Sequence, residues 1–172
     1  AGDKLNLNEG LKNGRAQLVW LIRIANNGQL DGNVKIADPQ GRRTLSGNVN
    51  ITNLSLAMLN PALMQGEKVS GVLNSNRRLG GNLQKPQVFG QLGLRNVDVE
   101  GSFMPVDLTT ANLSMLFNGM SSTLEGVIQT SQGQITLNGN ADWSQLNAWR
   151  ARVAAQGDGV RGTVRPQGRM DG

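Results

Sequence analysis

Between Gly71 and Leu94 the chain places apolar side chains at every second position, and this period constrains the fold more than any other feature of the sequence. Its last part, Val88-x-Gly90-x-Leu92-x-Leu94, puts a glycine in phase with the aliphatic residues. A period of two sets successive apolar side chains on one face of a β-strand. A glycine on that face leaves room for the sheet to bend or for another backbone to approach. The stretch therefore predicts a strand with one apolar and one polar face.

The same unit, apolar-x-Gly-x-apolar, recurs along the whole chain, centred on Gly32, Gly47, Gly71, Gly90, Gly126, Gly139 and Gly162. These centres are spaced too irregularly for a solenoid with coils of fixed length. Turn sequences such as Asp38-Pro39-Gln40-Gly41 separate the alternating runs. We therefore predict an all-β antiparallel meander or long curved sheet, with residues 1–172 forming a single domain. A change of apolar phase predicts a bulge near Arg95 and Asn96.

Two segments depart from the alternation. Leu56, Leu59 and Leu63 recur at helical spacing, which predicts one short helical segment near residues 55–65 that covers an end of the sheet core. The segment from Trp143 to Gln156 fits either a helical stripe or a strand. We favour the strand, because its arginines take the phase opposite to its apolar residues.

The apolar phase has two interpretations, the closed core of a β-sandwich or the lining of an open trough. Glycines within that phase, and few large residues to fill a core, favour the trough. About ten strands side by side would make it about 45–50 Å long. Its predicted groove-lining residues are Trp20, Ile22, Val34, Ile36, Val49, Ile51, Leu73, Leu79, Val88, Leu92, Leu94, Ile128, Ile135, Leu137 and Trp143.

Composition argues against several classes of function. The chain has no His and no Cys, so the usual general bases and nucleophiles are missing, and we expect no catalytic residues, cofactor or metal. The net charge of +5 comes from scattered Lys and Arg, and aromatic residues make up only 3%. A single-stranded nucleic acid needs aromatic stacking platforms, so we expect no nucleic-acid partner. No apolar run approaches the roughly 20 residues that span a bilayer.

Arg77 departs from the pattern, because it occupies the apolar phase between Leu73 and Leu79. A buried arginine without a partner is costly, so we expect its side chain to reach solvent at a rim or open mouth. Gly162, Arg165 and Gly168 likewise make the C-terminal end less hydrophobic than a groove strand should be.

The run Gly71-x-Leu73, then Leu79-x-Gly81-x-Leu83-x-x-Pro86-x-Val88-x-Gly90-x-Leu92-x-Leu94, resembles the signature of the TamB family of AsmA-like envelope proteins. The preceding Leu-Ser-Leu-Ala-Met-Leu-Asn-Pro segment and the later glycine units also resemble the C-terminal, periplasmic part of that family. The resemblance covers essentially the whole chain.

The resemblance implies an elongated curved sheet folded into a taco-like trough with an apolar interior. It also implies a fragment of a longer, inner-membrane-anchored protein that crosses the periplasm to an outer-membrane partner, TamA. Such proteins are linked to the assembly of outer-membrane β-barrel proteins, including autotransporters, and to phospholipid transport. Cargo could be acyl chains, detergent or unfolded outer-membrane β-strands, since these offer the same apolar surface. The alternative is a closed β-sheet spacer that links the two membranes' proteins without cargo.

Overall fold

The computed structural model describes residues 4–8, 14–63, 66–101, 108–157 and 160–164. Most of these residues form β-strands, and two short 3-10 helices interrupt them. The elements are β1 (Lys4–Asn8), β2 (Arg15–Ile24), β3 (Gly28–Ala37), β4 (Thr44–Ser55), η1 (Leu56–Ala62), β5 (Lys68–Gly81), β6 (Pro86–Glu100), β7 (Leu108–Gly119), β8 (Ser121–Thr130), β9 (Gly133–Asp142), η2 (Leu146–Ala148), β10 (Arg150–Gly157) and β11 (Val160–Val164).

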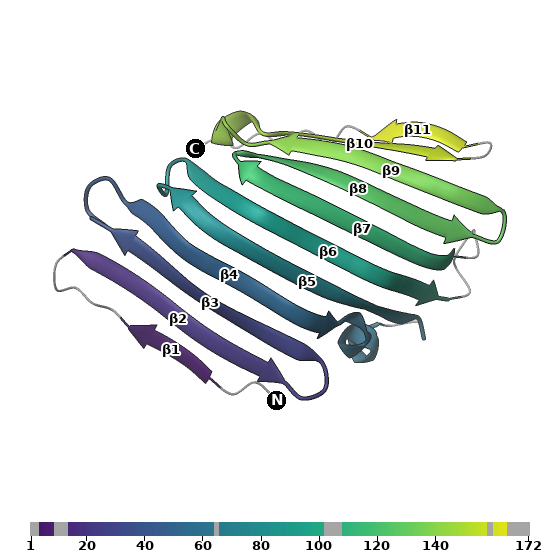
Figure 1. Cartoon of the computed structure of the whole chain (residues 1–172), viewed down its shortest axis with the longest axis horizontal. Helices are drawn as coiled ribbons and strands as arrows, with labels where there is room; N and C mark the ends of the chain where they lie inside the picture. The colour runs from purple at the N-terminus through teal and green to yellow at the C-terminus, as the bar shows by residue number, and fades with distance from the viewer. Residues whose placement is uncertain (1–3, 9–13, 64–65, 102–107, 158–159, 165–172) are drawn as a thin grey trace.

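The eleven described strands form one antiparallel sheet in chain order, from β1 to β11 (Figure 1). Each strand pairs with the one before it and the one after it, and β1 does not pair with β11. The sheet is therefore open, as predicted for the trough and not for a closed sandwich. Figure 1 shows β1 to β7 broadly from one side and β9 to β11 turned more nearly edge-on, as expected for a twisted, curved sheet.

The tight turns follow from local sequence. At Asn26–Gly28 the backbone of Asn26 takes a positive φ of 60°, and the Asn27 N–H donates to the Ile24 carbonyl at 2.9 Å. In the next turn the Gly41 N–H donates to the carbonyl of Asp38 at 3.0 Å. Asn and Asp tolerate left-handed backbone better than most residues, which lets them close such hairpins.

The bulges on β4 and β6, like the turns, each place an Asn in the left-handed backbone region. Asn53 and Asn96 have φ angles of 49° and 55°, and the strand register shifts beside each of them. The Asn53 N–H donates to Asn74 Oδ1 at 2.8 Å, and the Asn96 N–H donates to Asn112 Oδ1 at 3.0 Å. An amide of the following strand thus satisfies the donor that each bulge removes from the ladder. The predicted bulge near Arg95 and Asn96 is confirmed.

The short helical segment is also confirmed, as the 3-10 helix η1. It lies beside β5, where Asn60 Oδ1 accepts a hydrogen bond from the Val69 N–H at 2.8 Å. None of its residues is buried, and Met58 and Leu59 are 38% and 49% exposed. It therefore adjoins the end of β5 without burying its own apolar side chains. No helix in the described ranges is long and apolar enough to cross a membrane.

The segment from Trp143 to Gln156, which fitted either a helix or a strand, contains a short 3-10 helix followed by a strand. The three residues of η2 are followed by β10, which pairs with β9 from Arg150 to Gly157. The strand prediction thus holds for the second half of that segment.

The molecule has little buried core for its size. Its accessible surface is 11632 Å², against about 8,200 Å² expected for a compact chain of this mass. Among the described residues the buried apolar side chains are Leu45 and Ala111, 9% and 5% exposed. A sheet with no second layer packed on it accounts for both observations.

Candidate functional site

One face of the sheet carries apolar side chains from strand to strand, and we call it the apolar face. Residues directly opposite each other in neighbouring strands point to the same side of a sheet. The register pairs Ile22 with Leu30 and Leu30 with Ile51, and farther along it pairs Leu94 with Leu113. The apolar face comprises the residues in these rows. Its large apolar members on β2 to β10 are Leu18, Trp20, Ile22, Ile24, Leu30, Val34, Ile36, Leu45, Val49, Ile51, Leu54, Val69, Leu73, Leu79, Val88, Leu92, Leu94, Val97, Val99, Leu113, Met115, Phe117, Leu124, Ile128, Ile135, Leu137 and Val153.

The structure brings the predicted strand residues together on this face. Trp20, Ile22, Val34, Ile36, Val49, Ile51, Leu73, Leu79, Val88, Leu92, Leu94, Ile128, Ile135 and Leu137 all belong to its rows. Trp143 follows directly after β9, at the end of the sheet. Every one of these side chains, and Trp143, is half-buried. The face is therefore neither a packed, dry core nor a fully exposed surface.

The prediction omitted several members of the same face, including Leu30, Leu113, Met115 and Phe117. All of them stand in the apolar phase of their strands, so the period-two pattern alone could have found them. Ser75 and Ser122 also lie on this face and are buried, with 1% and 4% of their surface exposed. The Ser75 hydroxyl donates to the Gln91 carbonyl at 2.9 Å, which satisfies its hydrogen-bonding need.

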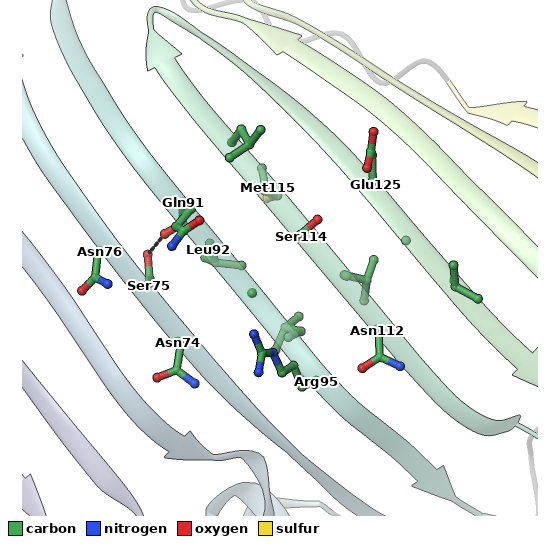
Figure 2. Close-up of a pocket in the computed structure, with 16 residues that line it drawn as sticks. Asn74, Ser75, Asn76, Gln91, Leu92, Arg95, Asn112, Ser114, Met115 and Glu125 are labelled. Atoms are coloured by element: carbon green, nitrogen blue, oxygen red, sulfur yellow. Dashed lines mark hydrogen bonds between the residues drawn. The ribbon is translucent and has the colours of Figure 1, made fainter.

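The opposite face carries a hollow, lined by polar and apolar residues, that the sequence did not predict. It has a volume of about 510 Å³ and crosses β5 to β8. Figure 2 shows the side chains of Asn74, Gln91, Asn112 and Glu125 along its lining, which come from four consecutive strands. Only the pairing of the strands brings these residues together. Asn74 and Asn112 each accept a hydrogen bond from a bulge N–H through Oδ1. No group of three metal-ligating side chains occurs in the described part of the chain.

Arg77 lies on the apolar face, opposite Val49 of β4 and Gly90 of β6. Strand β5 is interior to the sheet, and Arg77 is four residues from the strand's end at Gly81. Arg77 therefore does not lie on an edge strand, but the residue is only half-buried, which agrees with the expectation that its side chain reaches solvent. Its Nε atom is buried and has no hydrogen-bond partner. The period-two pattern fixes its face, and the middle position of β5 in the sheet fixes its distance from the edges.

Trp143 ties two strands together at one end of the sheet. Its backbone N–H donates to the Met120 carbonyl at 2.8 Å, at the tip of the hairpin that joins β7 to β8. Its indole Nε1–H donates to the Pro86 carbonyl, at the start of β6, at 3.1 Å. The residue thus links the end of β9 to the start of β6 around the hairpin tip. This hydrogen bond gives Trp143 a structural role in addition to its place among the predicted lining residues.

Comparisons with known proteins match the chain to one family. Residues 1–94 match a family model described as TamB, N-terminal domain. The chain is also 34% identical over 153 residues to the translocation and assembly module subunit TamB of Haemophilus influenzae. That alignment covers 89% of this chain and 12% of the relative, so the chain spans about an eighth of the relative's length. No solved structure matches the chain. The match to an N-terminal domain gives no support to the expectation of a C-terminal origin.

Proposed function

Because the chain belongs to the TamB family, we propose that its apolar face shields hydrophobic cargo on the way between the inner and outer bacterial membranes. The cargo is an acyl chain or the lipid-facing side of an unfolded outer-membrane β-strand. The role is a binding one without catalysis, within a periplasmic, inner-membrane-anchored protein that works with TamA. It serves the assembly of outer-membrane β-barrel proteins, autotransporters among them, and phospholipid transport.

One observation carries the proposal, namely the half-buried state of every predicted lining side chain in a sheet with no second layer. Apolar surface that stays in contact with water in the free protein releases free energy when a ligand covers it, about 25 cal/mol per Å². A continuous strip of such surface suits a chain-like ligand, since aliphatic side chains recur along it and make few directional contacts. Proteins rarely leave so large an apolar surface open without a binding role.

The experiment that tests the proposal places a charge on either face of the same strand. Leu92→Arg puts a guanidinium on the apolar face, and Gln91→Arg puts one on the opposite face. Leu137→Arg and Asn138→Arg repeat the comparison on β9. Native mass spectrometry with a monoacylglycerol measures binding to the 172-residue chain, and the same substitutions in the full-length protein measure transport in cells. We expect Leu92→Arg and Leu137→Arg to abolish both ligand binding and transport. Gln91→Arg and Asn138→Arg should have only mild effects on either.

A thermal melt of each variant separates the proposal from the spacer alternative. If arginines on the apolar face reduce transport only in proportion to lost stability, and the chain binds no acyl ligand, the spacer without cargo is correct. If binding and transport fail while the melting temperature holds, the cargo role is supported.

A further inference from the structure

The hollow on the face opposite the apolar face is a second candidate binding site. Its volume of about 510 Å³ lies within the range of about 300–1,000 Å³ that is usual for small-molecule sites. Gly93 of β6 belongs to its lining, and the register places it between Asn74 of β5 and Ser114 of β7. A Cβ at Gly93 would meet no atom within 4 Å. The lining is therefore open at this glycine.

Two strand bulges shape the hollow and fix part of its lining. The bulge residues are Asn53 of β4 and Asn96 of β6, and a bulge bends its strand and increases the local twist. Asn74 Oδ1 and Asn112 Oδ1 accept the bulge N–H groups at 2.8 and 3.0 Å. These bonds hold the two amides in place, and within the described residues their Nδ2 donors have no partner. Both amides are thus preorganised to donate to an acceptor from outside.

The hollow also contains two opposite charges that do not pair with each other. Arg95, beside the β6 bulge, and Glu125 of β8 both line it and are exposed. Figure 2 shows the Arg95 guanidinium between the side chains of Asn74 and Asn112, with Glu125 farther along the hollow. Among the described residues neither charge has a hydrogen bond or an ion pair. One end of the hollow therefore presents a cation among amide donors, and the other presents a carboxylate acceptor.

Neutral polar groups complete the lining between the two charges. They are the side chains of Asn76, Gln91 and Ser114, and none of them has a partner in the described part of the chain. An amide or a hydroxyl can both donate and accept hydrogen bonds. A ligand with several hydroxyl groups would use both functions, whereas a bare anion would use only the donors and an alkyl chain neither. Leu116, 59% exposed, adds an apolar contact for the C–H face of a ring.

This combination defines the chemistry of a matching ligand. We propose that the hollow binds a saccharide that carries a carboxylate group. The guanidinium of Arg95 binds the carboxylate by charge-assisted hydrogen bonds, and Glu125 and the side-chain amides bind the hydroxyl groups. The four strands β5 to β8 span about 14 Å from the first to the last, which accommodates more than one sugar ring. The site lies on the face opposite the apolar face, so this inference does not depend on the shielding of hydrophobic cargo.

The first test compares two sugars that differ only in a lactyl group carrying a carboxylate. N-acetylmuramic acid and N-acetylglucosamine are each titrated into the nitrogen-15-labelled 172-residue chain, and binding is measured from the NMR shifts of backbone amides. We expect shifts that map to β5–β8 and an affinity about fivefold higher for the acid, as for a solvent-exposed charge pair. Arg95→Gln should remove this preference. Arg78→Gln, the same charge change outside the hollow, should keep it.

A second variant blocks the hollow without touching its polar groups. Gly93→Leu fills the open position, and the fold should tolerate it because the added Cβ meets no atom and the φ of Gly93 is not positive. It should abolish the binding of both sugars. Asn48→Leu places the same side chain on the same face outside the hollow and should leave binding unchanged. A thermal melt verifies that each variant is folded.

The outcomes separate this proposal from the shielding role. Absence of binding by both sugars, equal affinity for the two, or a preference that survives Arg95→Gln overturns the saccharide site. Acetate that binds as tightly as N-acetylmuramic acid shows a simple anion site and also overturns it, as does tighter binding of an acidic tripeptide. Gly93→Leu should still bind a monoacylglycerol on the apolar face. Loss of acyl binding in the unchanged chain contradicts the shielding role alone.

Discussion

Arg77 and Arg78 are consecutive residues with opposite surroundings, because neighbours along a strand point to opposite faces of the sheet. Arg78 stacks on Phe89 at the polar face, whereas Arg77 leaves a buried Nε without a partner on the apolar face. A buried donor without a partner costs about 1–3 kcal/mol of stability. Arg77 thus stands at a position where folding alone would favour an aliphatic residue.

The substitution Arg77→Leu should raise the free energy of unfolding by about 1 kcal/mol, because it removes the unpartnered donor and matches the apolar surroundings. Arg78→Leu is the matched control and should lower it by about 0.5–1 kcal/mol, since the ring contact with Phe89 is lost. Urea denaturation followed by circular dichroism measures both values. If the free energy of unfolding falls equally in the two variants, Arg77 contributes as much to stability as Arg78 does.

Asp142 shows a second residue-scale effect, at the turn after β9. The Ser144 hydroxyl and backbone N–H both donate to Asp142 Oδ1, at 2.6 and 2.8 Å, and Arg150 lies directly opposite in the register. The hydroxyl bond, then the backbone bond, and to a smaller degree the charge of Arg150 hold the pKa of Asp142 below its ordinary value. Because the folded pKa is lowered, the stabilisation is present above the unfolded pKa and is lost as pH falls through the folded pKa.

Removing the hydroxyl by Ser144→Ala should therefore raise the pKa of Asp142 toward its ordinary value without reaching it, since the backbone donor remains. A carbon-13 NMR titration of the Asp142 carboxyl between neutral and acidic pH measures the change. An unchanged midpoint would mean that the hydroxyl does not contribute.

At the scale of one strand, β6 contains two glycines with different structural demands. Gly90 has a φ of 124°, and a Cβ there would collide with the Asn76 carbonyl oxygen of β5. A Cβ at Gly93, in contrast, would meet no atom within 4 Å. The glycine of the apolar phase is thus required by the backbone, while the one on the polar face is not.

Gly90→Ala should lower the free energy of unfolding by about 2 kcal/mol or more, because it combines a strained backbone with a collision against a neighbouring strand. Gly93→Ala should change it by less than about 1 kcal/mol in either direction. Equilibrium urea unfolding of the pair gives the comparison, and similar values for the two variants would contradict this account of Gly90.

At the scale of the whole molecule, the sheet exposes about 40% more surface than a compact chain of its mass, with its apolar side chains half-buried on one face. A hydrophobic dye such as ANS should therefore bind the native chain in the absence of denaturant. The fluorescence should disappear in the same urea range as the β-sheet signal, and Leu92→Arg should weaken it more than Gln91→Arg. A native chain that binds no dye would indicate that its apolar face is covered.

The sequence by itself determined the strands, their apolar phase and the bulge near Asn96, because the direction of a side chain along a strand follows a local period of two. It therefore also placed Arg77 on the apolar face. Glycines in the apolar phase favoured an open trough over a closed core, but alternation alone does not separate the two, since both bury one face of each strand to some degree.

Only the tertiary structure decided what depends on contacts between strands far apart in the chain. The linear strand order leaves the sheet open. Pairing across β5 to β8 assembles the hollow on the opposite face, and the indole of Trp143 reaches the Pro86 carbonyl fifty-seven residues away. The same pairing surrounds Arg77 with residues that cannot partner it, at the middle of the sheet instead of its rim. Such neighbours are set by strand register, which local periodicity does not encode.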